Sequence, residues 1–338
     1  MIISRTPYRI SLFGGGSDFP EYYREHGGRV LSFAINKYCY ISVRKLPPFF
    51  AHHDRVVYSK VENTISYSEI QHPAVRAVLE YLHPPYGVSI THDGDIPARS
   101  GIGSSSAFTV GLLNALQALE RSRSEKRQLA ETAIYIEQEK IGETVGSQDQ
   151  ICSAYGGFNA IEFYRDEPFR VIPLDLPGRR QQEFLSHLAL FFTGISRISS
   201  DVAKEQKQNI PRNATRLKEL SCMAKTAVKI LRSASDITEI GYLLHESWKI
   251  KKQLSSKVTS SQLDGIYEKG LNNGALGGKL LGAGAGGFML FFVTPENRER
   301  LKAALSDYLY VPFDIDMNGS QIIFNDYGDM ECRMTLSR

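Results

Sequence analysis

The stretch at residues 96–108, IPARSGIGSSSAF, constrains the fold of this chain more than any other. Apolar residues recur at three- and four-residue steps directly after it, which predicts a helix. Ser104 is a suitable N-cap, so we expect the Gly/Ser segment to be the loop that opens this helix. Unpaired N–H groups at a helix start, and glycines that let a ligand approach the backbone, favour an anion site. The alternative is an ordinary turn that caps a core helix. The candidate anion-binding residues are Ser100, Gly101, Gly103, Ser104, Ser105 and Ser106.

Composition limits the class of protein. The chain has 338 residues, 42% hydrophobic and 23% charged, as expected for a globular protein of two domains. A net charge of +3 without a basic arm argues against a nucleic-acid partner. No apolar run approaches the ~20 residues that span a bilayer, and the N-terminus lacks the pattern of a secretion signal. The four cysteines show no metal-binding spacing, so we expect reduced thiols in a cytoplasmic protein without a membrane partner.

Strand patterns dominate the first half of the chain and helical patterns the second, with a proline- and charge-rich segment at residues 165–180 between them. We therefore predict an α+β fold with two domains, residues 1–175 and 176–338. Strands are expected at residues 1–13, 30–34 and 39–44, and a strong helix at residues 129–141. The polar, basic segment at residues 202–221 is expected to be mobile, either as a solvated helix face or as a lid over a substrate.

Two further glycine clusters exclude some functions. The sequence GAGAGG at residues 282–287 matches GxGxxG, but an apolar strand follows it where a dinucleotide-binding fold needs a helix. The sequence GALGGKL is one residue short of a P-loop and has no Ser or Thr after Lys279. Protein-kinase motifs are absent. These observations disfavour a nucleotide-dependent oxidoreductase and leave phosphoryl transfer, which needs positioning, a divalent ion, a cation and a carboxylate near the attacking hydroxyl.

Three motifs in order resemble those of the GHMP kinases. SRTPYRISLFGGGSDF at residues 4–19 is similar to PGRxxLxGEHxDY, PARSGIGSSSA at 97–107 to PxxxGLGSSA, and KLLGAGAGGF at 279–288 to KxTGAGxGGC. The resemblance covers nearly the whole chain. It implies a ribosomal-protein-S5-like N-terminal domain, a ferredoxin-like C-terminal domain, ATP with Mg²⁺ as cofactors, and a small-molecule sugar substrate. A monomer and a homodimer both stay open.

The resemblance also implies catalytic roles. Asp149, in VGSQDQ, matches the carboxylate that faces the sugar's anomeric hydroxyl, and is the candidate general base or orienting group. Arg9 matches the cation of the first motif. Beside Asp149 it would keep that carboxylate ionised, and it could stabilise charge on the transferred phosphoryl group. The alternatives are a turn residue for Asp149 and a surface strand cation for Arg9.

Metal and substrate residues follow from the same motifs. Ser105 matches the metal-contacting serine and Glu137 the metal-binding glutamate, with Glu139 as the rival position. Asp18 matches the sugar-binding aspartate, although it could instead cap the helix that follows. The other residues expected to contact substrate are Gly15, Gly16, Gly284, Gly286 and Gly287.

Finer likeness points to one branch of the family. The turn GGGSDFP and the segment TGISRISSDVAKEQ resemble D-glycero-D-manno-heptose 7-phosphate kinases, with L-fucose kinases as relatives. The galactokinase turn has the sequence GEH where this chain has three glycines. This difference argues against galactose as the substrate. We expect phosphorylation of an anomeric hydroxyl to give a 1,7-bisphosphate; the alternatives are an L-fucose or similar sugar 1-kinase and a catalytically silent sugar-binding protein. Candidate cations for the substrate's own phosphate are Arg29, Lys37, Arg44 and Arg197.

Overall fold

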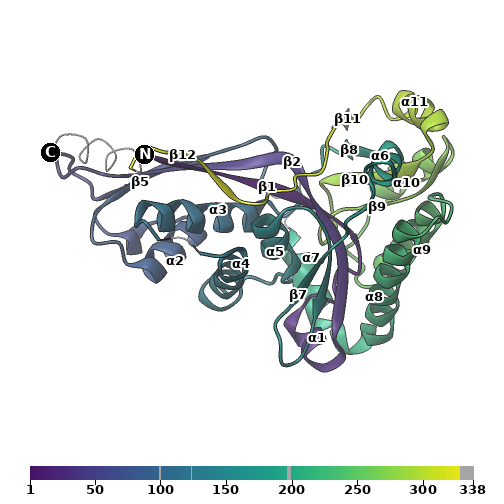
Figure 1. Ribbon diagram of the computed structural model, residues 1–338, viewed down its shortest axis with the longest axis horizontal. Coiled ribbons are helices and arrows are strands. Elements are labelled where there is room, and N and C mark those ends of the chain that lie inside the picture. The colour runs from purple at the N-terminus through teal and green to yellow at the C-terminus, as the bar shows by residue number, and fades with distance from the viewer. Residues whose placement is uncertain (99, 123, 196–198, 328–338) are drawn as a thin grey trace.

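A computed structural model describes residues 1–98, 100–122, 124–195 and 199–327, which form two sheets with helices packed against them (Figure 1). The first sheet contains β1 (Ile2–Phe13), β2 (Gly28–Lys45), β3 (Asp54–Val57), β4 (Val61–Thr64), β5 (Val88–Gly94), β6 (Phe158–Phe163), β7 (Arg170–Pro173) and β12 (Gln321–Asn325). The second contains β8 (Leu188–Phe192), β9 (Ala275–Leu280), β10 (Phe288–Val293) and β11 (Leu309–Tyr310).

The α-helices are interspersed among these strands, and four of them, α7 to α10, follow one another between β8 and β9. The mixed helix and strand content that the sequence predicts is confirmed. They are α1 (Pro20–His26), α2 (Pro73–Leu82), α3 (Ser104–Leu119), α4 (Lys126–Tyr135), α5 (Gln148–Tyr155), α6 (Gly178–Ser186), α7 (Ser199–Gln208), α8 (Ile210–Arg232), α9 (Glu239–Lys252), α10 (Ser261–Leu271) and α11 (Pro295–Ala304). None of the described helices is both long and apolar enough to cross a bilayer.

The long antiparallel pair β1–β2 forms the centre of the first sheet. The sequence predicts two strands where the structure has the single strand β2. The polar residues Asn36 and Lys37 interrupt the apolar pattern, and they lie at a register shift between the pairs Tyr8–Ile35 and Pro7–Tyr38. A β-bulge of this kind absorbs the interruption without ending the strand. As a result β2 runs as one strand from Gly28 to Lys45 and pairs with β1 on both sides of the bulge.

The two sheets divide the chain in order, with one exception. The first sheet has the order β12-β1-β2-β5-β3-β4, with β6 and β7 branching from β2, and α2, α3, α4 and α5 lie along it (Figure 1). β7 falls inside the segment expected to be a boundary, and β12 returns from the C-terminal part to pair with β1. The division at residue 175 stays a prediction, and the first sheet takes its edge strand from beyond it.

An aromatic cluster joins the two sheets. Phe33 on β2 and Phe158 on β6 lie 6.0 and 5.3 Å from Phe184 of α6, between ring centroids. Phe292 on β10 of the second sheet lies 6.4 Å from the same ring. All four side chains are buried. One hydrophobic cluster therefore contains residues of both sheets, whereas the other face of the second sheet packs in a cluster of its own around Trp248 and Phe291.

We predict that Phe184→Ala destabilises the whole protein, because it removes the ring on which both sheets pack. The expected loss is about 3–5 kcal/mol, as for other buried aromatic residues cut back to alanine. Denaturant unfolding followed by circular dichroism measures it. Phe49→Ala is the control, since that side chain is 90% exposed. An equal midpoint for the two variants would contradict this account of the core.

Candidate active site

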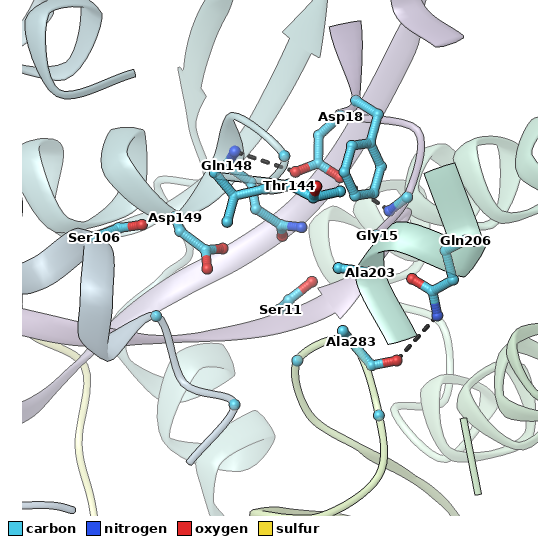
Figure 2. A pocket seen from close by; sticks show the side chains of 18 of the residues that line it. Ser11, Gly15, Asp18, Ser106, Thr144, Gln148, Asp149, Ala203, Gln206 and Ala283 are labelled. Atoms are coloured by element: carbon cyan, nitrogen blue, oxygen red, sulfur yellow. Dashed lines mark hydrogen bonds between the residues drawn. The ribbon is translucent and has the colours of Figure 1, made fainter. Parts of the chain in front are cut away.

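A cleft of about 580 Å³ lies between the two sheets and collects segments from the whole chain (Figure 2). Its walls are the β1 end with the turn at Gly14–Asp18, the loop before α3, the 142–149 loop, α7, α9 and the GAGAGG loop. Of the residues expected at the site, those that line it are Arg9, Gly15, Gly16, Asp18, Gly101, Gly103, Ser104, Ser105, Ser106, Asp149, Gly284 and Gly286. Ser100, Glu137 and Gly287 are not among the lining residues.

A bidentate ion pair between Arg9 and Asp149 forms part of the wall. Arg9 Nε donates to Asp149 Oδ1 at 2.7 Å and Nη2 to Oδ2 at 2.5 Å. Nη1 donates to the carbonyl oxygen of Gly101 at 2.9 Å. The arginine is almost fully buried, whereas the aspartate keeps 21% of its side chain exposed to the cleft. Arg9 is thus a buried charge with every side-chain nitrogen paired, and Asp149 is the member of the pair that a ligand can reach.

Asp18 is buried between the first turn and the start of α5. Its Oδ1 accepts from the backbone N–H of Gly16 at 2.9 Å, and its Oδ2 from that of Gln148 at 3.2 Å. Burial, helped by the charge of Asp149, raises the pKa of Asp18 although these two hydrogen bonds oppose the shift. The alternative prediction of a helix cap is wrong, because the N-cap of α1 is Phe19 and no side chain caps that helix.

The two glycine loops meet backbone to backbone. The N-cap of α3 is Gly103, with φ of 73°, so Ser104 is the first helical residue and not the cap that the sequence predicts. A Cβ on Gly101 would lie 2.8 Å from the carbonyl oxygen of Leu281, and one on Gly287 2.1 Å from that of Ser100. Only glycine allows this approach. Ser100 and Gly287 therefore belong to the joint between the loops, behind the cleft wall.

Glu137 lies under the Gly/Ser loop, on a π-helical turn at Ile136–Ile141. Ser106 donates its hydroxyl to Glu137 Oε2 at 2.8 Å, and the amide of Gln150 donates to the same oxygen. The other oxygen, Oε1, is buried without a hydrogen-bond partner. Burial, with the charge of Glu143, raises the pKa of Glu137 to about 7, against hydrogen bonds that favour ionisation.

These residues fit a magnesium ion of the kind held by few protein oxygens. Mg²⁺ is usually bound by one or two carboxylates together with substrate phosphates. Within the described ranges no cluster of three or more His, Cys, Asp or Glu could hold a metal alone. The unpartnered Glu137 Oε1 and the exposed hydroxyl of Ser105 are suitable donors, although the serine that contacts Glu137 is Ser106. Glu139 is exposed, whereas Glu137 is buried under the Gly/Ser loop and accepts from Ser106, a residue that lines the cleft, so the geometry favours Glu137.

Two lysines of the cleft have no role in the sequence-based hypothesis. Lys279, the first residue of the third motif, donates to the carbonyl oxygen of Leu12 at 3.0 Å. Lys251 of α9 donates to those of Leu280 and Gly282 at 2.8 and 2.6 Å. Burial and the nearby Arg9 lower the pKa of Lys279 to about 7, and burial with the charges of Lys279 and Arg9 lowers the pKa of Lys251 well below its ordinary value. Lys279 could have been found from the sequence, because it is the first residue of a motif. Lys251 could not, because it lies in the basic run KIKK, which has the pattern of a solvated helix face.

The cations expected to bind a substrate phosphate lie elsewhere. Arg29 is paired with Glu162 through Nε at 2.9 Å, and neither Lys37 nor Arg44 lines the cleft. Arg197 lies outside the described residues.

The polar segment at residues 202–221 forms the end of α7 and the start of α8, and Gln206 donates to the carbonyl oxygen of Ala283 at 3.0 Å (Figure 2). The inner face of α7 is therefore a wall of the cleft; its mobility stays a prediction.

We predict that Glu137→Gln changes how stability depends on pH. The carboxyl has a pKa of about 7 in the folded protein and an ordinary value of 4.5, so between these values the folded state binds more protons than the unfolded state. The free energy of unfolding of the wild type should then fall as pH rises, by up to about 1.4 kcal/mol per pH unit. The glutamine variant lacks this loss.

The measurement is the melting temperature from pH 5 to pH 8 in buffer with EDTA. The melting temperature of Glu137→Gln should rise relative to that of the wild type as pH increases. The matched control is Glu139→Gln, because that carboxylate is exposed. Parallel curves for wild type and Glu137→Gln would refute the raised pKa.

Comparison with known proteins adds a family. The model of the GHMP kinases N terminal domain matches residues 69–157, and that of the GHMP kinases C terminal domain matches residues 225–311. The chain is 30% identical over 321 residues to a D-glycero-alpha-D-manno-heptose 7-phosphate kinase of Campylobacter jejuni. That alignment covers 90% of this chain and 93% of the other protein. It is 25% identical to the bifunctional fucokinase/GDP-fucose pyrophosphorylase of Arabidopsis thaliana, over 91% of this chain and 31% of that protein.

A solved structure agrees with the fold. A D-glycero-D-manno-heptose 1-phosphate kinase from Bacteroides thetaiotaomicron superposes with a TM-score of 0.78 at 24% identity, over 97% of this chain and all of the other. The two-domain fold implied by the three motifs is thereby confirmed. Both domain models, the full-length relative and this architecture agree: the chain belongs to the GHMP kinase family.

Proposed function

We propose that this GHMP-family sugar kinase transfers the γ-phosphoryl group of ATP to the anomeric hydroxyl of D-glycero-D-manno-heptose 7-phosphate. The observation that carries the proposal is the Arg9–Asp149 pair, whose carboxylate borders the cleft between the Gly/Ser loop and the turn at Gly14–Asp18. Asp149 takes the hydroxyl proton or orients the hydroxyl while the sugar oxygen forms a bond to the γ-phosphorus. The bond from that phosphorus to the β-phosphate oxygen breaks, and ADP leaves.

The nucleotide phosphates bind at the Gly/Ser loop. The loop opens the long helix α3, whose first N–H groups and positive dipole end favour anions. Arg9, Lys251 and Lys279 line the same cleft, and Asp149 is the ion-pair partner of Arg9. Burial lowers the pKa of the two lysines, and phosphate oxygens bound beside them would favour their charged forms. Phosphoryl transfer needs such preplaced positive charge, because charge develops on the transferred oxygens.

Glu137 together with Ser105 or Ser106 would hold Mg²⁺ beside these phosphates. When bound, the ion neutralises charge on the phosphate oxygens and helps to align them. Glu137 is kept in place by Ser106 and Gln150, so its free oxygen Oε1 is prepared for a ligand.

The sugar occupies the side of the cleft formed by the first turn. Gly15 and Gly16 line it with their backbone, and a Cβ on Gly16 would lie 2.9 Å from Leu217 Cδ2, so this turn can approach α8 closely. Asp18 uses both carboxylate oxygens to fix the loop that carries Gln148 and Asp149, so it positions the reacting carboxylate in addition to facing the substrate. The 30%-identical relative supports the heptose 7-phosphate as substrate, and the fucokinase relative supports L-fucose as the alternative.

A substrate panel tests the proposal. ADP release with Mg-ATP is measured for D-glycero-D-manno-heptose 7-phosphate, L-fucose, D-galactose and D-mannose. The phosphoheptose should give the highest kcat/KM, and its product should contain a phosphate on the anomeric carbon by ³¹P NMR. Faster turnover of L-fucose would replace the preferred substrate. If no sugar is turned over, the chain is a sugar-binding protein without this activity.

We predict that Asp149→Asn lowers kcat by about 10²- to 10⁴-fold, the usual contribution of a general base. The amide keeps the shape of the carboxylate but cannot accept a proton, so the Kd for Mg-ATP should stay within about twofold of wild type if Asp149 acts on the sugar hydroxyl. Calorimetry and steady-state kinetics measure the two quantities. Asp307→Asn is the control, because that side chain is 76% exposed. A wild-type kcat in Asp149→Asn would remove the residue from the reaction.

A further inference from the structure

A second cavity of about 520 Å³ adjoins the cleft. The two share the side chains of Thr144 and Lys204 as lining. The remaining walls of the second cavity come from α1 and from the junction between α7 and α8. A ligand anchored at Asp149 could therefore extend past Lys204 into this space. Figure 2 shows Asp149 on one side of the cleft and the α7 residues Ala203 and Gln206 on the other.

The second cavity has one lysine without a partner. Lys207 Nζ lies 2.6 Å from Glu21 Oε1, and His26 Nε2 lies 3.7 Å from Glu25 Oε2, a contact that is an ion pair only when the histidine is protonated. Lys204 has no hydrogen-bond or ion-pair partner in the part of the chain that the structure describes. Lys207 is thus balanced by Glu21, and the unpaired ammonium group of Lys204 lies at the wall that the two cavities share.

The junction between α7 and α8 completes the wall of the cavity. Ile210 and Pro211, the first residues of the long helix α8, line it, and Pro211 has no backbone N–H to donate. Because α7 ends at Gln208, with only Asn209 before α8 begins, the dipoles of the two adjoining helix ends offset each other. Lys204 is therefore the feature of this wall that favours an anion.

We propose that the second cavity binds the phosphate monoester at the far end of the sugar substrate, with Lys204 as the principal cation. This inference rests on the function proposed above, in which the reacting hydroxyl lies at the opposite end of a phosphorylated sugar. Lys207 contributes a second charge when its ion pair with Glu21 is loosened by the phosphate. The subsite selects a sugar phosphate over a free sugar, because a neutral hydroxyl gains little from an unpaired ammonium group.

The test compares Lys204→Ala with wild type on two substrates, the heptose 7-phosphate and the same heptose without phosphate. The KM for the 7-phosphate should rise about 10- to 100-fold, the range for losing a charge-assisted hydrogen bond. The KM for the free heptose and the KM for ATP should not change. Lys225→Ala, which removes an exposed lysine of α8 that lines neither cavity, is the matched control.

A second variant should act in the opposite direction. Glu21→Gln removes the carboxylate that holds Lys207, so the KM for the 7-phosphate should fall while that for the free heptose stays constant. Inorganic phosphate should inhibit competitively against the 7-phosphate, and less strongly in Lys204→Ala. A phosphate that inhibits both proteins equally binds outside this cavity and would count against the subsite.

The outcomes separate the two proposals. If wild type turns over the 7-phosphate but Lys204→Ala behaves like wild type, the subsite is wrong and the proposed function stands. An equal rise in KM for both substrates would make Lys204 a contact to the sugar and would also overturn the subsite. If wild type turns over no sugar at all, the proposed function fails and the subsite fails with it.

Discussion

The bidentate pair between Arg9 and Asp149 is the contact on which the site depends. It joins the middle of β1 to the first turn of α5, and through the carbonyl oxygen of Gly101 it also holds the Gly/Ser loop. A guanidinium this deeply buried is tolerated only when its donors are all satisfied, and here each nitrogen has an acceptor. The pair therefore fixes the positions of β1, α5 and the Gly/Ser loop relative to one another at the cleft.

Polar and charged groups are concentrated around that pair in a way that favours an anionic ligand. Lys251 and Lys279 donate to backbone carbonyl oxygens. Burial and the charge of Arg9 lower the pKa of both lysines, and the charge of Lys279 lowers that of Lys251 further. A ligand with several negative charges would relieve this repulsion. The repulsion between these groups destabilises the free protein, and the attraction between them and a bound anion would offset it.

Much of the site could be predicted from the sequence because motif residues keep their order. Arg9 and the Gly/Ser loop come from the first and second motifs and Asp149 from the segment VGSQDQ, and the structure brings them together. The choice between Glu137 and Glu139 could not be made, because it depends on which side of a π-helical turn faces the loop. Lys251 was missed because a lysine in a basic run carries no local sign of burial.

The errors in the fold have a similar origin. The strand β2 was expected as two pieces because a bulge cannot be seen in a period-two pattern. Asp18 was a reasonable helix cap from its position, but tertiary contacts use both of its oxygens in another loop. β12 leaves no local indication that its partner is β1, at the opposite end of the chain. In each case the structure depends on contacts between residues far apart in the sequence, which a local sequence pattern does not reveal.

The joint between Ser100 and Gly287 has a consequence for how the protein assembles. Ser100 and Gly287, which lie far apart in the sequence, must meet before the Gly/Ser loop has its final shape. The entropy of closing so long a loop has to be overcome first, which is typical of proteins with high contact order and slow folding. A ligand bound across this joint resists the separation of its two loops, so nucleotide should protect the native state by mass action. The N-terminal part synthesised first carries the anion-binding sequence but not the partner loop that completes it.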